Sequence, residues 1–237
     1  MTYKILAGVD RDNTINHDEK AYFGSEDNWK AELKFCSGAI EGLRKLSENP
    51  DIAIAVLTSQ VGIAKGVLTI EQVEEVNETM DRLLREQGVN VDSWQYSPFV
   101  NRKGAKRWEE RDITTLNYDF VLEEGDEKLN LLKPQDGLLR RAAKELNIEY
   151  DSVQKYVLGD RSSDALCGIN SGGVGILVNN PSVGRGTSSF YKTDKIETMV
   201  NDPEYDGRIY IVSDLIEAAR IILEGKWSCI NRSSNIQ

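Results

Sequence analysis

The feature that most constrains this chain is an apolar run near its N-terminus that ends in two aspartates. The stretch from Lys4 to Thr14 reads KILAGVDRDNT, so Asp10 and Asp12 follow a run of isoleucine, leucine and valine. Such a run, bounded by turn-forming residues, is typical of a strand that is buried on both faces of a parallel sheet. Alternate residues of a strand point the same way, so the two carboxylates can converge and would then repel unless a cation or a proton intervenes. Taken alone, the pair could equally well cap a loop.

Four further apolar runs predict buried strands, at residues 52–57, 156–158, 172–178 and 208–212. Between them, apolar residues recur at three- and four-residue steps, which is typical of amphipathic helices. Helical patterns of this kind cover residues 38–48, 69–88, 134–146 and 213–223, and a further helix is expected after Ser162. The alternation of strands and helices predicts an α/β fold with a parallel sheet that is covered by helices on both faces.

Two segments interrupt this alternation. Residues 15–35 are polar and aromatic, and we interpret them as a small flap after the first strand that adds nothing to the core. Residues 98–128 mix glycine, proline and clustered charges, and we interpret them as an insertion at the rim of an active site. A solvated excursion without a role explains the insertion about as well. Residues 1–237 then form a single domain with no large cap domain.

Composition excludes several classes of partner. The net charge of -10 disfavours binding to nucleic acid or to an anionic membrane surface, although a small positive pocket remains possible. Cys36, Cys167 and Cys229 are far apart and form neither a metal-spaced pair nor a disulfide framework. No apolar segment is long enough to cross a bilayer. We therefore expect a cytoplasmic protein, and the sequence leaves its oligomeric state open.

Polar residues with a common chemistry follow the other predicted strands. Thr58 and Ser59 end the second strand, Lys133 precedes a helix, and Asp160 ends the third strand with Asp164 one turn later. Singly, these could be plain strand-end residues, a solvated lysine and a helix-capping acid. Together, and at the ends of strands that share one edge of a sheet, they predict a site for phosphate and for Mg²⁺, which prefers oxygen ligands.

Four motifs, VDRDNT, VLTSQ, LLKP and VLGDRSSD, resemble those of the haloacid dehalogenase superfamily of phosphatases with an aspartate nucleophile. Two longer runs, DRDNTIN and LTSQVGIAKG, resemble the branch of histidinol-phosphate and D-glycero-D-manno-heptose 1,7-bisphosphate phosphatases. The resemblance covers residues 3–178 and implies a Rossmann-like sheet.

The resemblance implies roles for the two aspartates of the first motif. Asp10 would be the nucleophile that takes the phosphoryl group, and Asp12 would protonate the leaving alcohol and then activate water. To act as an acid, Asp12 needs a raised pKa, and we expect neighbouring carboxylates to raise it. We expect Mg²⁺ and Lys133 to keep Asp10 ionised.

The remaining motifs would bind the phosphate and the metal. Thr58 and the backbone around Ser59 would hold the phosphoryl oxygens, while Lys133 would balance their charge. Mg²⁺ would be held by Asp10, the main-chain carbonyl of Asp12, and Asp160. The supporting residues are Asp164, which would orient Lys133 or a metal-bound water, and Arg161.

The chain departs from this branch where the branch carries a zinc loop. Residues 97–99 and 129–131 read SPF and LNL in place of its cysteines and histidine, so we expect no zinc. The branch's arginine before the lysine is Leu132, which removes a contact for a second anionic group. Its usual glycine is Asn13, which tolerates unusual backbone angles.

These motifs favour an Mg²⁺-dependent phosphomonoesterase that acts through an aspartyl-phosphate on a small phosphorylated metabolite, such as a sugar or polyol phosphate, including a heptose (bis)phosphate. One alternative is a nucleic-acid 3′-phosphatase of the same fold, for which Lys103, Lys106 and Arg107 form the only visible basic cluster. A non-catalytic binding protein is a further alternative, but such a protein usually loses the aspartates or the lysine.

Overall fold

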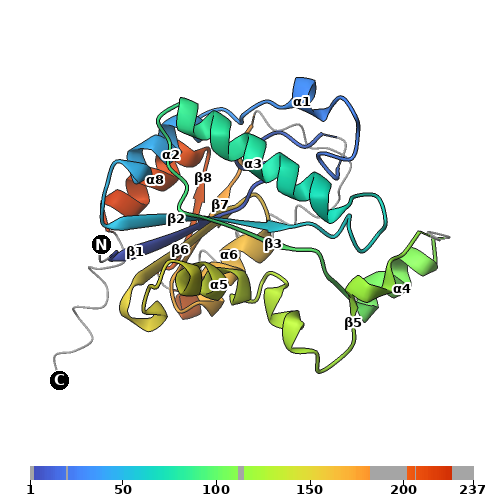
Figure 1. Ribbon diagram of the computed structural model, residues 1–237. Coiled ribbons are helices and arrows are strands. Elements are labelled where there is room, and N and C mark those ends of the chain that lie inside the picture. The colour runs from blue at the N-terminus through green and yellow to red at the C-terminus, as the bar shows by residue number, and fades with distance from the viewer. Residues whose placement is uncertain (1–2, 20, 112–114, 182–201, 206, 226–237) are drawn as a thin grey trace.

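The computed structural model describes residues 3–19, 21–111, 115–181, 202–205 and 207–225. Its centre is a six-stranded sheet in the order β3-β2-β1-β6-β7-β8, with all neighbouring strands parallel (Figure 1). The strands are β1 (Ile5–Val9), β2 (Ile52–Ser59), β3 (Ser93–Ser97), β6 (Gln154–Gly159), β7 (Val174–Val178) and β8 (Ile209–Val212). The five predicted strands and the α/β class are confirmed, and β3 is a strand that the sequence analysis missed.

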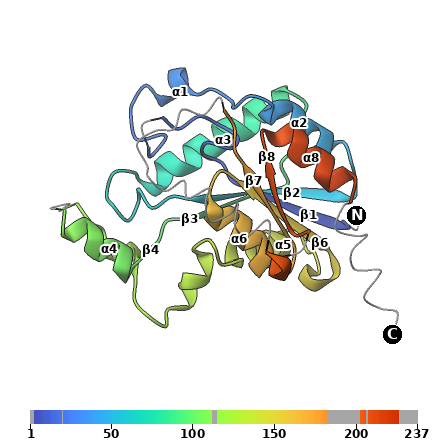
Figure 2. The ribbon, with the colours of Figure 1, turned by 180° about the vertical axis from the view of Figure 1, so that it is seen from behind.

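Helices cover both faces of this sheet, as Figures 1 and 2 show. One layer holds α2 (Ala39–Ser47), α3 (Ile70–Glu86) and α8 (Leu215–Leu223), and the other holds α5 (Gly137–Glu145) and α6 (Ser162–Asn170). Side chains alternate between the layers: Ala7 and Val9 of β1 belong to the core under α2, α3 and α8, whereas Leu6 packs with α5. This alternation follows from the two-residue period of a strand.

The helix patterns predicted their elements with small errors at the ends. α3 begins after Thr69, whose hydroxyl and the Gln72 side chain form a reciprocal capping box. α5 begins at Gly137, later than the predicted start at Pro134. Short 3-10 helices are present as well, namely η1 (Tyr118–Phe120), η2 (Glu127–Leu131), η3 (Tyr150–Ser152) and η4 (Pro203–Tyr205).

The flap at residues 15–35 contributes to the core, so our prediction that it does not is wrong. Ile15, Phe23 and Trp29 are buried in the main apolar cluster, and the rings of Phe23 and Trp29 meet edge to face. Trp29 begins the short helix α1 (Trp29–Glu32). The three apolar residues are spaced irregularly, so no helix or strand period revealed which of them would be buried.

The insertion at residues 98–128 contains regular structure, which its sequence did not predict. It includes α4 (Arg102–Glu109) and the strands β4 (Val100–Asn101) and β5 (Val121–Leu122), which pair in parallel. A small apolar cluster of Ala105, Val100 and Ala64 joins it to the loop after β2, and Figure 1 shows α4 beyond the carboxyl-end side of the main sheet.

Two observations bear on the expected cellular setting. Within the residues that the structure describes, every helix is too short or too polar to traverse a lipid bilayer. Cys36 and Cys167 are both buried and carry free thiols, while Cys229 lies outside the described residues.

Candidate active site

The site is built where three neighbouring strands end. β1 lies between β2 and β6, so Asp10, Thr58 and Asp160 meet at one edge of the sheet. The backbone N–H of Asp10 donates to the carbonyl of Leu158 at 2.8 Å, which carries the β1–β6 pairing one residue beyond the strand. Ser59 is the last residue of β2 and is partly exposed. The predicted convergence of strand-end residues is therefore present.

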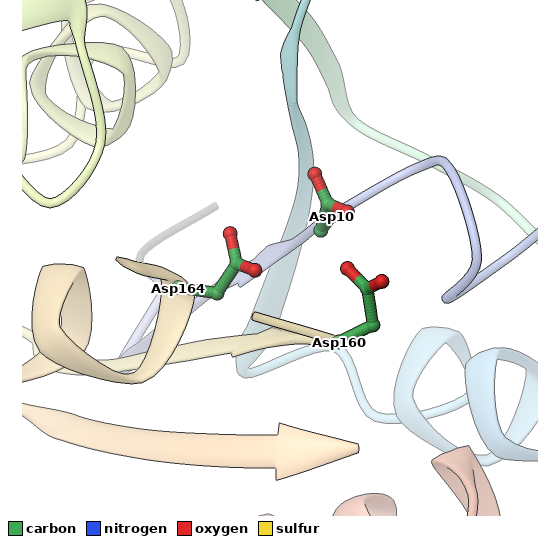
Figure 3. Close-up of side chains that lie close together, drawn as sticks. All are labelled: Asp10, Asp160 and Asp164. Atoms are coloured by element: carbon green, nitrogen blue, oxygen red, sulfur yellow. The ribbon is translucent and has the colours of Figure 1, made fainter. Parts of the chain in front are cut away.

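Three carboxylates form the centre of this site, and with Lys133 we call them the acidic cluster. Oxygens of Asp10, Asp160 and Asp164 all lie within 4.8 Å of one another, and all three residues are buried (Figure 3). The buried Lys133 ammonium lies 2.5 Å from an oxygen of Asp10 and 2.5 Å from one of Asp164. It also donates to the carbonyl of Leu57 at 3.1 Å. Three negative charges thus share one buried positive charge.

Asp164 reaches the cluster from the first turn of α6. Its Oδ2 accepts a hydrogen bond from the backbone N–H of Arg161 at 3.0 Å. Gly159 makes room for it, because a Cβ at that position would lie 2.3 Å from the Asp164 carboxyl carbon. The Arg161 side chain is about half exposed, and its Nε lies 3.9 Å from Asp160 Oδ1. Arg161 therefore stands at the edge of the cluster and adds a second, more solvated positive charge.

The charge imbalance changes the protonation of Asp10. Burial raises its pKa, Lys133 lowers it, and Asp164 and Asp160 raise it again, so that the pKa of Asp10 is raised to about 8. Lys133 alone therefore leaves the pKa of Asp10 raised, and the expectation that Mg²⁺ and Lys133 together keep Asp10 ionised stays a prediction. A divalent cation among these oxygens would supply the missing charge. The donor set, buried carboxylate oxygens only, suits a hard cation such as Mg²⁺.

Asp12 has a different environment, which we call the Asp12 clamp. Arg11 donates to both of its oxygens, from Nε to Oδ1 and from Nη2 to Oδ2, each at 3.0 Å. Gln60 Nε2 donates to Oδ2 at 2.8 Å, and the Thr58 hydroxyl lies 3.4 Å from the same oxygen. The carboxylate is thus held by donors from two strand ends.

The pKa of Asp12 is lowered, so our prediction of a raised pKa is wrong. Burial acts to raise it, but the charge of Arg11 and hydrogen bonds from Arg11, Gln60 and Asn16 outweigh burial. The physical reason is the direction of the Arg11 side chain, which turns inward to its sequence neighbour and is fully buried. A bidentate guanidinium contact favours the ionised carboxylate.

The sequence analysis missed Arg11 and Gln60 as site residues. Both are buried, and each lies next to a residue that was identified: Arg11 between the two aspartates, and Gln60 directly after Ser59. Their positions inside the motifs were the available signal. Asn13 was interpreted correctly, because it has a positive φ of 63°, a conformation that asparagine tolerates better than most residues.

A cavity of about 300 Å³ opens within the flap, and the backbone N–H of Asp18, which lines it, donates to Asn13 Oδ1 at 3.0 Å. Its lining includes Asp18, Tyr22, Phe23 and Trp29. Burial and the negative charge of Asp12 raise the pKa of Asp18 to about 7. The cavity thus offers aromatic and acidic groups within the flap.

Comparisons with known proteins give close relatives in one group of enzymes. The chain is 32% identical over 156 residues to D-glycero-beta-D-manno-heptose-1,7-bisphosphate 7-phosphatase of Yersinia pestis, covering 66% of this chain and 70% of that protein. It is 32% identical over 163 residues to the protein of the same name from Haemophilus influenzae, covering 69% and 74%. No protein-family model matches the chain.

A solved structure has the same fold. The D,D-heptose 1,7-bisphosphate phosphatase of B. bronchiseptica, complexed with magnesium and phosphate, superposes with a TM-score of 0.63 at 20% identity. The match covers 95% of this chain and 99% of that one. At 20% identity this likeness shows the fold alone. The family relationship is shown by the two relatives at 32% identity.

Proposed function

Since this chain belongs to the family of D-glycero-D-manno-heptose 1,7-bisphosphate 7-phosphatases, with the haloacid dehalogenase-like fold, we propose that it hydrolyses the phosphate ester of a small phosphorylated sugar. A heptose bisphosphate is the first candidate substrate. The observation that carries the proposal is the meeting of three buried carboxylates and a buried lysine at the end of β1. Phosphoryl transfer depends mainly on positioning and on charge neutralisation, which this arrangement can provide.

The two aspartates of the first motif divide the chemistry between them. A carboxylate oxygen of Asp10 attacks phosphorus, the ester P–O bond breaks, and Asp12 gives a proton to the leaving oxygen. Because the pKa of Asp12 is lowered before substrate binds, Asp12 must take up this proton as the substrate binds. In the second step Asp12 takes a proton from a water that attacks the aspartyl-phosphate. The P–O bond to Asp10 then breaks, which releases inorganic phosphate and restores the carboxylate.

The surrounding residues hold the phosphoryl group. Thr58 and the backbone around Ser59 would donate hydrogen bonds to its oxygens, and Lys133, oriented by Asp164, would offset its charge. Mg²⁺ held by Asp10, Asp160 and the main-chain carbonyl of Asp12 would neutralise the negative charge that the phosphoryl oxygens add. The expected absence of zinc stays a prediction.

The cavity in the flap is the candidate position for the rest of the substrate. The partly exposed ring of Tyr22 can pack against the face of a sugar, and the Asp18 carboxyl can accept bonds from its hydroxyls. Leu132 stands where the related branch has an arginine, so this chain must contact a second phosphate, if the substrate carries one, through other groups.

The test is a measurement of phosphate release with Mg²⁺ from heptose 1,7-bisphosphate, other sugar and polyol phosphates, and an oligonucleotide with a 3′-phosphate. We expect turnover of a sugar phosphate that is lost in the Asp10→Asn variant. No release from any compound, or equal release by Asp10→Asn, would refute the proposal. A clear preference for the oligonucleotide would show that the substrate is the 3′-phosphate of a nucleic acid and not a sugar phosphate.

A further inference from the structure

Asn77 is a polar residue on the buried side of α3. The helix packs against the sheet through Val73, Val76, Met80 and Leu84, and Asn77 lies beside this apolar stripe and is only 6% exposed. Asparagine is a weaker helix former than leucine, and burying its amide costs free energy unless the amide is hydrogen-bonded. An apolar residue would serve the packing of this helix at least as well, so packing does not account for Asn77.

The amide of Asn77 is bonded to the Asp12 clamp. Arg11 Nη1 donates to Asn77 Oδ1 at 2.8 Å, and both residues are buried. Arg11 uses its other two nitrogens, Nε and Nη2, on the two oxygens of Asp12. A chain of hydrogen bonds therefore runs from α3 through a fully buried guanidinium to the carboxylate at the end of β1.

This chain of contacts fixes the orientation of Asp12. A guanidinium that meets both carboxylate oxygens sets the plane of the carboxyl group as well as its position. The guanidinium is fully buried, and Asn77 supplies its third polar contact from a rigid helix. Small displacements of a proton donor have large effects on rate, because the donor must meet the leaving oxygen at hydrogen-bond distance.

We propose that Asn77 is a positioning residue for proton transfer: it fixes the Arg11 guanidinium, which in turn fixes the orientation of the Asp12 carboxyl group. The inference rests on the proposed function, in which Asp12 gives its proton to that oxygen as the ester P–O bond breaks. Arg11 is the second positioning residue, and neither side chain needs to touch the substrate.

The experiment compares two esters that differ in their need for a proton donor. The phenolate of para-nitrophenyl phosphate leaves without protonation, whereas the alcohol of benzyl phosphate, which is similar in shape, needs the proton. The kcat/KM value covers steps up to loss of the alcohol or phenol, so hydrolysis of the aspartyl-phosphate does not affect the comparison. The quantity measured, with Mg²⁺ present, is the ratio of kcat/KM for benzyl phosphate to that for para-nitrophenyl phosphate.

Asn77→Leu keeps the volume and removes the acceptor, so we expect the ratio to fall by about 10-fold or more. Asn77→Asp keeps an oxygen acceptor for Arg11 and should restore most of the ratio. Glu78→Gln, at the next and exposed position of the same helix, is the matched control and should leave the ratio unchanged.

Equal loss with both esters in Asn77→Leu, or an unchanged ratio, would assign Asn77 a purely structural role and overturn the inference. So would an Asn77→Asp variant with the same ratio as Asn77→Leu. If Asn77→Leu does not fold, Asn77→Ser, whose side chain is too short to reach Arg11, gives the same comparison. If the unchanged protein releases phosphate from none of the sugar and polyol phosphates, the proposed function itself fails, and this inference fails with it.

Discussion

The acidic cluster and the Asp12 clamp lie at the end of the same strand, yet their charges are balanced in opposite ways. In the cluster, three carboxylates share the single buried ammonium of Lys133, and the pKa of Asp10 is raised to about 8. In the clamp, one carboxylate faces a guanidinium and three neutral donors, and the pKa of Asp12 is lowered. Asp10 and Asp12 are two residues apart in the sequence.

The difference shows that each region is suited to a different task. The cluster has an excess of negative charge, so a bound cation stabilises it. The cation is needed also when a phosphate binds, because the phosphate adds further negative charge. The clamp is already neutralised, so it gains nothing from a cation and instead holds a carboxylate in a defined orientation. Four predictions test this division, in order of decreasing effect.

The largest effect separates the two aspartates. With para-nitrophenyl phosphate, Asp10→Asn should lose turnover by roughly 10⁴-fold or more, because the nucleophile is gone. Asp12→Asn should still form the aspartyl-phosphate but hydrolyse it slowly, since only the water step then lacks its base. Intact-protein mass spectrometry should show a phosphorylated Asp12→Asn protein and an unmodified Asp10→Asn protein. Phosphorylation of neither variant would contradict the division of labour.

The next effect concerns the cation. Asp160→Asn removes one of the cluster's oxygen ligands, and the Mg²⁺ concentration for half-maximal activity should rise by about 10–100-fold. Phosphate release at a series of Mg²⁺ concentrations measures it. Asp119→Asn, an exposed position in the insertion, is the control and should keep the original requirement. An unchanged requirement in Asp160→Asn would place the metal elsewhere.

A third effect is on stability as the pH changes. Because the pKa of Asp10 is raised from 3.8 to about 8, the folded state holds this proton more tightly than the unfolded state. The resulting stability is fully present below the ordinary pKa and is lost as the pH rises toward about 8. In EDTA, urea unfolding should therefore show a steeper loss of stability over this range for the unchanged protein than for Asp10→Asn.

Mg²⁺ should reduce this difference between the two proteins, since the cation stabilises the ionised carboxylate. The comparison with Asp10→Asn is needed because the pKa of Asp18 is also raised, to about 7, and contributes with the same sign. Parallel stability curves for the two proteins in EDTA would contradict the raised pKa of Asp10.

The smallest effect comes from the clamp. Gln60→Leu removes one neutral hydrogen bond to the Asp12 carboxylate, which is worth about 1 kcal/mol, or roughly a 5-fold change in rate. The kcat/KM value for benzyl phosphate measures it, with Gln135→Leu at an exposed position as the control. A loss as large as that of Asp12→Asn would mean that Gln60 takes part in the chemistry itself.

Much of the fold followed from local patterns. β1 is a continuous apolar run, β2 and β6 contain apolar runs at residues 52–57 and 156–158, and α3 has both an apolar stripe and a capping box, so each is specified by its own residues. β3 was missed because its sequence, SWQYS, is half polar and becomes a strand by pairing with β2. The buried residues of the flap were missed for a related reason. They are buried by packing against core residues that are distant in the sequence.

The sequence by itself determined that Asp10, Thr58 and Asp160 meet at the active site, because apolar runs and the turns after them place their polar ends at one edge of a parallel sheet. Only the tertiary structure decided the charge state and orientation of those residues. The ammonium beside Asp10 comes from 123 residues away, and the amide that holds Arg11 comes from 66 residues away. The pKa of a buried group depends on the charges and donors that folding brings within a few ångströms, and spacing along the chain does not contain that information.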